Sequence, residues 1–318
     1  MAPSDRDIGP EGMVGRGRIA LLGAAAVATV AATVDGSRPV RFGTAVDVVQ
    51  LNVSVTDAHR RYVTGLGERD FAVYEDGAPQ AVSFFSGGDL PFSLALLIDG
   101  SASMDETLPV ARKAAARFVA TMRPRDLASV TQFNERVTML QDYTSDHAAL
   151  DRAIDSTRAE GTTALYTALY VSLRELRAQQ TTTGEARRRA IIMLTDGEDT
   201  VSSVSEDQVL ELARRSDVIV YAIALRSGTR SLITRDQASH FLATLTRDTG
   251  GEVQYPRALS DLEGVYSRIA DELRTQYTLG YVSANPSRDG GWRHISVLTP
   301  TRQDLLVRYR LGYYAPRH

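Results

Sequence analysis

The chain has 318 residues, with 36 Lys and Arg against 39 Asp and Glu, so its formal net charge is -3. Such a chain has no overall positive field to attract nucleic acids, which argues against nucleic-acid binding. The absence of cysteine removes thiol nucleophiles, disulfides and thiolate metal sites. With 43% hydrophobic residues the chain can build a sizeable core, and its length predicts more than one domain.

The first 35 residues predict an export signal. Arg16 and Arg18 precede the uncharged run IALLGAAAVATVAATV, which ends in small residues, and this is the layout of a secretory signal peptide. The run is shorter than the roughly 20 residues that span a bilayer, so a permanent membrane anchor is the second interpretation. We therefore expect an exported protein (periplasmic, secreted or cell-surface), started at Met1 or Met13, that contacts a membrane only through this segment.

Both ends of the remaining chain predict short β-strands. In residues 36–90, apolar and polar side chains alternate from Val46 to Val55, and FAVYEDGAPQAVSFF predicts two strands around the Asp76-Gly77 turn. Residues 277–318 return to short β segments, namely YTLGYV, RHISVL and DLLVRYR. Together the two ends hold enough strands for one small sandwich of the immunoglobulin type, and we expect them to form it jointly.

Residues 91–276 differ from the ends, because apolar strands alternate here with helical segments. The expected strands lie at 93–99, 127–133, 190–196 and 218–225. The expected helices run from about 107 to 122, 147 to 156, 164 to 179, 205 to 215, 235 to 249 and 259 to 276. Continuous Val, Ile and Leu runs between amphipathic helices are typical of a mostly parallel sheet that helices cover on both faces. The sequence therefore predicts a doubly wound α/β domain inserted in the β-sandwich.

Three segments of this domain carry oxygen side chains beside the expected elements. They place Asp99 at the end of the first strand with Ser101 and Ser103 just after it, Thr163 just before a helix, and Asp196 at the end of a second strand. Ligands of open parallel sheets bind at the carboxyl ends of the strands, so we expect these side chains at one edge of the sheet. Carboxylate and hydroxyl oxygens suit a hard divalent cation, with Mg²⁺ favoured and Mn²⁺ or Ca²⁺ as alternatives.

This pattern resembles the metal-ion-dependent adhesion site of von Willebrand factor type A (VWA) domains, which have a Rossmann-like fold. The resemblance covers about 91–276. It implies that Ser101, Ser103 and Thr163 touch the metal directly and that Asp99 and Asp196 act directly or through water. The flanking segments, including VTDAHRRYVTGLGERDFAVYEDG and RLGYYAP, resemble the exported bacterial VWFA-related proteins.

Two main classes of function follow. The resemblance implies an exported adhesion module whose cation captures an Asp or Glu of a protein partner. The alternative is a metal-dependent hydrolase in which the ion activates water, and this chemistry needs a general acid or base beside the metal. The three site segments hold no His, Lys or Cys, so we expect a binding protein rather than an enzyme. A structural module of the cell envelope with a stabilising metal is a further alternative.

Overall fold

The computed structural model describes residues 48–88, 90–183, 187–196, 199–225 and 232–317. Residues 46–318 form one compact unit. The predicted export signal lies outside the described residues. No helix in the described part of the chain is both long and apolar enough to cross a membrane.

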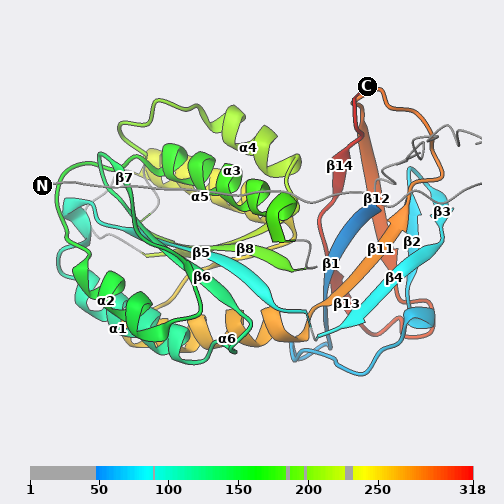
Figure 1. The fold of residues 1–318 in the computed structure, drawn as a ribbon, viewed down its shortest axis with the longest axis horizontal. Coiled ribbons are helices and arrows are strands. Elements are labelled where there is room, and N and C mark those ends of the chain that lie inside the picture. The colour runs from blue at the N-terminus through cyan, green and yellow to red at the C-terminus, as the bar shows by residue number, and fades with distance from the viewer. Residues whose placement is uncertain (1–47, 89, 184–186, 197–198, 226–231, 318) are drawn as a thin grey trace, which may run out of the picture. The chain divides into compact units, whose positions relative to one another are not determined.

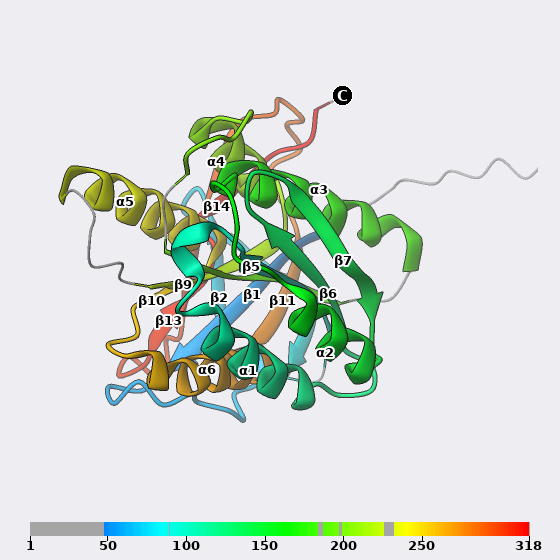
Figure 2. The ribbon, with the colours of Figure 1, turned by 90° about the vertical axis from the view of Figure 1, so that its left-hand side faces the viewer.

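A mostly parallel sheet with the strand order β10-β9-β8-β5-β6-β7 forms the centre of the α/β part (Figures 1 and 2). Its strands are β5 (Phe92–Asp99), β6 (Leu127–Phe133), β7 (Val137–Thr144), β8 (Arg188–Thr195), β9 (Val218–Ala224) and β10 (Val253–Gln254). Only the edge strand β7 pairs antiparallel with its neighbour among these described strands. Every residue of β5, β8 and β9 is buried, as their continuous apolar runs predicted.

Helices cover both faces of this sheet (Figure 2). They are α1 (Leu108–Ala120), α2 (His147–Ser156), α3 (Leu165–Thr183), α4 (Glu206–Arg214), α5 (Leu232–Thr249) and α6 (Leu262–Thr275). One apolar core joins α1, α2 and α6 to the side chains of one sheet face. A second core joins α3, α4 and α5 to the other face. The predicted mixed α/β architecture is therefore confirmed, and the ends of the helices differ from the expected ones by only a few residues.

Two antiparallel sheets contain the remaining strands, in the orders β13-β1-β11-β4 and β14-β12-β2-β3. The strands are β1 (Val48–Thr56), β2 (Ala72–Glu75), β3 (Ala78–Gln80), β4 (Val82–Gly87), β11 (Tyr277–Val282), β12 (Trp292–Leu298), β13 (Leu306–Arg308) and β14 (Gly312–Tyr314). Each sheet combines strands from both ends of the chain, since β1 pairs with β11 and β2 with β12. Both sheets contribute to one apolar core that includes Leu51, Val73, Leu279 and Val297.

The turn between β2 and β3 lies at the predicted Asp76-Gly77 pair. Both residues have positive φ, 48° for Asp76 and 82° for Gly77, which is the backbone that a two-residue hairpin turn needs. The next strand, β4, belongs to the other sheet and pairs with β11. The immunoglobulin-type topology and the domain borders after residues 90 and 276 stay predictions.

Candidate metal centre

Asp99, the last residue of β5, is completely buried. One carboxylate oxygen accepts a hydrogen bond from the backbone N–H of Ser101 at 2.9 Å, and the other accepts one from the hydroxyl of Thr195 at 2.7 Å. Burial and, to a smaller extent, the nearby Asp196 carboxylate raise the pKa of Asp99 to about 6, against the lowering effect of these hydrogen bonds. A buried carboxylate in this environment is stabilised as an anion by any cation placed beside it.

Asp196 lies close to Asp99 because the two strands that precede them are neighbours. In the parallel pair β5 and β8, Leu194 lies beside Ile98, so both strands end at the same edge of the sheet. Asp196 is partly buried there. Two adjacent carboxylates repel each other, and a cation between them removes this repulsion. The edge predicted from the sequence is therefore the edge at which these two side chains lie.

The serine loop turns back over the end of β5 in a short 3-10 helix, Ala102–Met104. The hydroxyl oxygens of Ser101 and Ser103 lie 3.1 Å apart. Ser101 is buried whereas Ser103 is exposed, so the pair reaches from the interior of the site to its surface. Two neutral hydroxyls at this spacing are suitable hard ligands for a cation such as Mg²⁺.

Gly100 allows another segment of the chain to approach this loop closely. A Cβ atom at residue 100 would lie only 2.6 Å from the carbonyl oxygen of Arg158 and 2.8 Å from Nε2 of Gln132. The backbone of Gly100 also accepts a hydrogen bond from the N–H of Glu160 at 2.8 Å. From the sequence alone, Gly100 is expected only as a turn residue after the strand, and the close approach of Arg158 and Gln132 follows from the tertiary structure.

The segment held beside Gly100 continues to Thr163. The carbonyl oxygen of Gly161 accepts a hydrogen bond from the N–H of Ala102 at 3.0 Å, which fixes the threonine segment against the serine loop. Thr163 is buried, with 4% of its surface exposed, and α3 begins two residues later. The structure thus places all five predicted residues on three segments that meet at one edge of the sheet.

The loop after β8 holds the start of α3 in place. Asp199 accepts a hydrogen bond from the N–H of Tyr166 at 3.1 Å, and the hydroxyl of Ser202 accepts one from the N–H of Thr167 at 2.9 Å. The hydroxyl of Thr200 accepts one from the N–H of Thr163 at 2.9 Å. These side chains therefore cap the helix and position Thr163, a role that sequence reasoning missed.

The donor set at this edge fits a hard divalent cation. It consists of two carboxylates and three hydroxyls, and such oxygens are the ligands that Mg²⁺, Mn²⁺ and Ca²⁺ prefer. Within the described residues no group of three or more His, Cys, Asp or Glu is placed to hold a metal. A metal at this edge would therefore depend on Ser101, Ser103 and Thr163, with Asp99 and Asp196 in direct or water-mediated support.

Comparison with known protein families identifies the segment that carries the candidate metal centre. Residues 94–198 match the von Willebrand factor type A domain family. This segment is a VWA domain. No curated protein matches the sequence.

Three solved structures of other proteins are similar to this chain. A von Willebrand factor type A protein from Catenulispora acidiphila is 16% identical over 72% of this chain and 50% of its own, with a TM-score of 0.50. The vWF domain of the type V pili tip protein Mfa5 from Porphyromonas gingivalis is 14% identical over 57% of this chain and 94% of its own, with a TM-score of 0.47. Proximal thread matrix protein 1 from the mussel byssus, with a zinc-occupied MIDAS motif, is 16% identical over 58% of this chain and 48% of its own, with a TM-score of 0.48. At 16% identity, the likeness to the Catenulispora acidiphila protein concerns the fold alone.

Proposed function

We propose that the VWA domain holds a divalent cation at the edge formed by β5 and β8 and uses it to capture an acidic group of a protein partner. The observation that carries this proposal is the buried Asp99 carboxylate, which lies beside Asp196 beneath a loop of paired serine hydroxyls. Mg²⁺ is the cation that we expect, and Mn²⁺ or Ca²⁺ are alternatives.

Neutral ligands give this site its selectivity for acidic groups. Three of the five donors are hydroxyls, so a bound cation keeps residual positive charge and offers a coordination position to an Asp or Glu from outside. Asp99 and Ser101 are buried, whereas Ser103 is exposed and Asp196 is partly exposed. This gradient of burial leaves the outer side of the site accessible to a partner.

We propose a binding role rather than catalysis. Within the described residues of the three site segments, no His, Lys or Cys is available as a general acid or base. Both carboxylate oxygens of Asp99 already accept hydrogen bonds. Export of the protein, by cleavage or anchoring of the first 35 residues, is part of the same proposal and rests on the sequence of that segment.

Metal binding is tested by thermal unfolding of the full chain in Mg²⁺, Mn²⁺ or Ca²⁺ and in chelator. An ion that binds only the folded state at 100 times its Kd stabilises it by about 2.7 kcal/mol. We expect a rise in Tm for the native chain and none for Asp99→Ala. Asp105→Ala is the matched control, because this exposed carboxylate lies in the next turn of the same loop and should leave the metal effect intact. A native Tm that responds to none of the ions would refute the metal centre.

Partner capture is tested with immobilised peptides that differ only in one acidic residue. Peptides with a single Asp or Glu should bind in the presence of the metal, and their Asn or Gln counterparts should not. Chelator and Asp99→Ala should each abolish the binding. Metal-dependent cleavage of a p-nitrophenyl ester or phosphate that is lost in Asp99→Ala would instead support a hydrolase. A metal-dependent Tm without peptide binding would support a structural module.

A further inference from the structure

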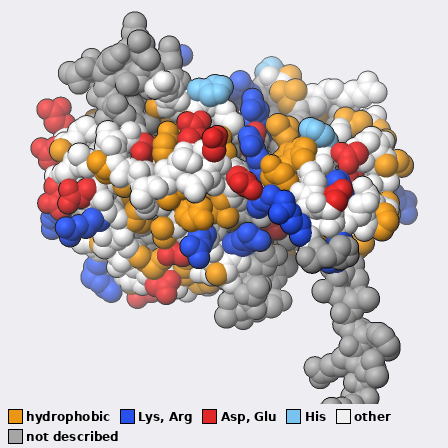
Figure 3. Space-filling model, turned by 90° about the horizontal axis from the view of Figure 1, so that it is seen from above, with side chains coloured by type: hydrophobic (Ala, Val, Ile, Leu, Met, Phe, Trp, Pro, Cys, Tyr) orange, Lys and Arg blue, Asp and Glu red, His pale blue; other side chains and the backbone are white. Residues whose placement is uncertain are grey.

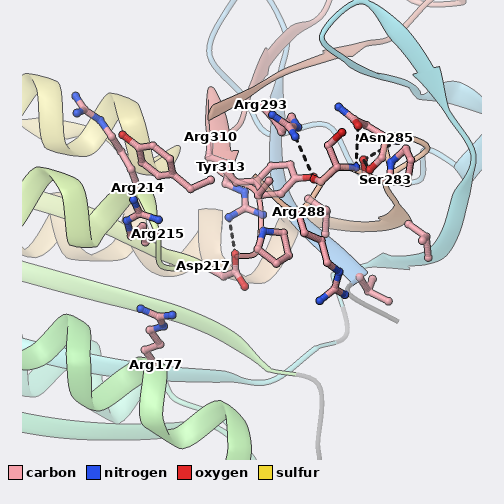
Figure 4. A pocket seen from close by; sticks show the side chains of 18 residues that line it. Arg177, Arg214, Arg215, Asp217, Ser283, Asn285, Arg288, Arg293, Arg310 and Tyr313 are labelled. Atoms are coloured by element: carbon pink, nitrogen blue, oxygen red, sulfur yellow. Dashed lines mark hydrogen bonds and ion pairs between the residues drawn. The ribbon is translucent and has the colours of Figure 1, made fainter. Parts of the chain in front are cut away.

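A second candidate site lies in a pocket of about 440 Å³ between the α/β part of the chain and the antiparallel sheets (Figure 4). The α/β part contributes Arg177 on α3 and Arg215 just after α4. The antiparallel sheets contribute Ser283 after β11 and Tyr313 on β14. Asp217, also in the wall, directly precedes β9 and so marks the amino end of the parallel strands. The candidate metal centre lies at their carboxyl end, so a ligand in this pocket would not touch it.

The buried and half-buried arginines of this pocket are all paired with carboxylates. These pairs are Arg214 with Asp248, Arg215 with Glu211, Arg293 with both Glu75 and Asp289, and Arg310 with Asp217. Asp217 pairs with Arg189 as well. Arg177 and Arg288, which also line the pocket, are exposed, and Arg288 has an interaction of its own. The less exposed part of the wall therefore presents guanidinium N–H groups and carboxylate oxygens side by side.

A wall of ion pairs favours a neutral polar ligand over either kind of ion. An anion in the pocket is repelled by the carboxylates, and a cation is repelled by the guanidinium groups. A hydroxyl group both donates and accepts, so it matches a guanidinium N–H on one side and a carboxylate oxygen on the other. A ligand with several neighbouring hydroxyls therefore suits this wall better than a charged group does.

Arg310 provides a buried donor that the chain leaves without an acceptor. Only 8% of its surface is exposed, and its terminal nitrogens bind the Asp217 carboxylate and, at 2.9 Å, the carbonyl oxygen of Gln50. Its third nitrogen, Nε, is buried and has no hydrogen-bond partner among the described residues. Buried polar groups in folded proteins are nearly always hydrogen-bonded. Because Arg310 lines the pocket, a hydroxyl bound there would supply the missing acceptor.

Two tyrosine rings give the pocket apolar surface next to these polar groups. Tyr314 is half-buried, and the guanidinium of Arg215 lies 4.0 Å from its ring centre. The hydroxyl of Tyr313 donates a hydrogen bond to Glu75 at 2.9 Å, which holds that ring in place. Hydrophobic side chains also lie directly beside a band of lysine and arginine on the face seen in Figure 3. Sugars combine hydroxyl groups with apolar C–H faces, and the electronegative face of an aromatic ring packs on such C–H groups.

The loop after β11 adds neutral hydrogen-bonding groups. Asn285 is exposed and lines the pocket, and Figure 4 shows it on the side opposite Arg177. Its side-chain oxygen accepts a hydrogen bond from the N–H of Ser287 at 3.0 Å, while its NH₂ group adds two donors. Arg293 donates to the carbonyl oxygen of Ser287 at 3.2 Å and so fixes the loop to the wall. A wall ordered before the ligand arrives lowers the entropic cost of binding.

We propose that this pocket binds a small neutral saccharide. The ring of Tyr314 packs on an apolar face of the sugar, and Asn285 binds one of its hydroxyls. The ion pair of Arg310 and Asp217 exchanges hydrogen bonds with neighbouring hydroxyls. The volume of the pocket lies within the range of small-ligand sites. Such a site would attach the protein to a glycan without any cation, which is a function separate from metal-dependent capture.

The proposal is tested by isothermal titration calorimetry of the full chain with maltose, cellobiose, lactose and N,N′-diacetylchitobiose. Chelator is present throughout, so that the result is independent of any metal. We expect saturable binding of at least one of these neutral disaccharides. Its affinity should stay the same when NaCl is raised from about 50 mM to about 500 mM, because salt screens interactions between charges and the ligand carries none. Binding of none of the four, or an affinity that falls with salt, would overturn the proposal.

Two variants and two controls locate the binding in this pocket. Tyr314→Leu should weaken it about tenfold, because the sugar loses its aromatic contact. Asn285→Ala should weaken it through a lost hydrogen bond, and its place on an exposed loop makes it informative even where Tyr314→Leu lowers stability. Tyr255→Leu is the matched control, since Tyr255 is 45% exposed and lies outside the pocket lining. Tyr255→Leu and Asp99→Ala should both bind normally. Native affinity in both Tyr314→Leu and Asn285→Ala would refute the site and leave the metal-dependent function untouched.

Discussion

Gly100 shows how one missing side chain shapes the metal centre. Its Cα lies where the segment that leads to Thr163 crosses the serine loop, so a Cβ atom would meet the carbonyl oxygen of Arg158 and the amide of Gln132. The carbonyl oxygen is backbone and cannot rotate away as a flexible side chain would. The close packing of the two loops therefore depends on glycine at this position.

We predict that Gly100→Ala lowers the free energy of unfolding by about 1–3 kcal/mol, the usual cost of overpacking. It should also weaken the stabilisation by metal, because the two loops that carry the hydroxyl ligands are forced apart. Urea denaturation with and without Mg²⁺ measures both effects.

Gly264→Ala is the matched control for this prediction. Gly264 lies in α6, and the nearest atom to its added Cβ would be the flexible end of Arg268 at 3.8 Å. Alanine favours a helix over glycine by up to about 1 kcal/mol, so this variant should be as stable as the native chain or more stable. Equal effects of the two substitutions would contradict the steric explanation for Gly100.

At the scale of elements, the start of α3 depends on the loop that follows β8. Asp199 and Ser202 accept hydrogen bonds from the N–H groups of the first helical turn, and the hydroxyl of Ser202 donates to Asp199 at 2.6 Å. A helix leaves its first N–H groups without partners in the helix, and these side chains satisfy two of them. The position of Thr163 is therefore coupled to the loop after β8.

We predict that Asp199→Ala costs about 1 kcal/mol of stability, the typical effect of a lost helix cap, and also lowers the affinity for metal. Asp146→Ala provides the comparison, because Asp146 caps α2 by accepting from the N–H groups of Ala148 and Ala149 at 2.9 and 3.2 Å. It should cost similar stability without changing metal affinity. Isothermal titration with Mg²⁺ distinguishes the two variants, and an unchanged affinity in Asp199→Ala would disprove the coupling.

For the molecule as a whole, Glu272 connects the α/β part of the chain to the antiparallel sheets. This buried carboxylate of α6 accepts hydrogen bonds from Ser54 on β1 at 2.6 Å, Tyr221 on β9 at 2.8 Å and Tyr62 at 2.9 Å. It also forms an ion pair with Arg308 on β13. The network therefore crosses the predicted domain border, in agreement with the single compact unit of residues 46–318.

We predict that Glu272→Gln lowers the free energy of unfolding by about 1–3 kcal/mol, because the amide cannot accept all the hydrogen bonds of the buried carboxylate, whereas Arg308 keeps its ion pair with Glu252. Glu263→Gln, in the same helix, removes an exposed ion pair with Arg117 and should cost less than about 1 kcal/mol. Urea denaturation followed by circular dichroism compares the two. Similar losses for both variants would mean that the buried network contributes little.

Alkaline pH should weaken the same junction. Burial, together with the charge of Glu272, raises the pKa of Tyr62 and Tyr221 far above the ordinary 10.0. Above about pH 10 the unfolded chain releases these protons while the folded chain retains them, so stability is complete below this pH and falls as pH rises further. Tyrosinate absorbance should therefore appear in two stages, exposed tyrosines first and the buried ones with unfolding. Ionisation of all tyrosines before unfolding would contradict this expectation.

Local patterns in the sequence determined most of the secondary structure. Continuous apolar runs predicted β5, β6, β8 and β9, because strands buried on both faces need apolar side chains at every position. The edge strand β7 was missed, since its partly exposed residues mix apolar and polar types and its antiparallel pairing with β6 defines it. The short β10 was missed because two residues carry no periodicity.

The sequence by itself identified the five oxygen-bearing residues of the candidate metal centre near the ends of strands and the start of a helix. It could do so because the type and order of these side chains are properties of the chain. Their role as metal ligands stays a prediction. The tertiary structure alone decided what supports them: the cap from Asp199, the close approach at Gly100 and the network around Glu272. The residues joined by these contacts lie far apart in the sequence, up to 218 positions for Ser54 and Glu272. No local periodicity of the sequence predicts such residue pairs, because they meet only when the sheets and helices pack together.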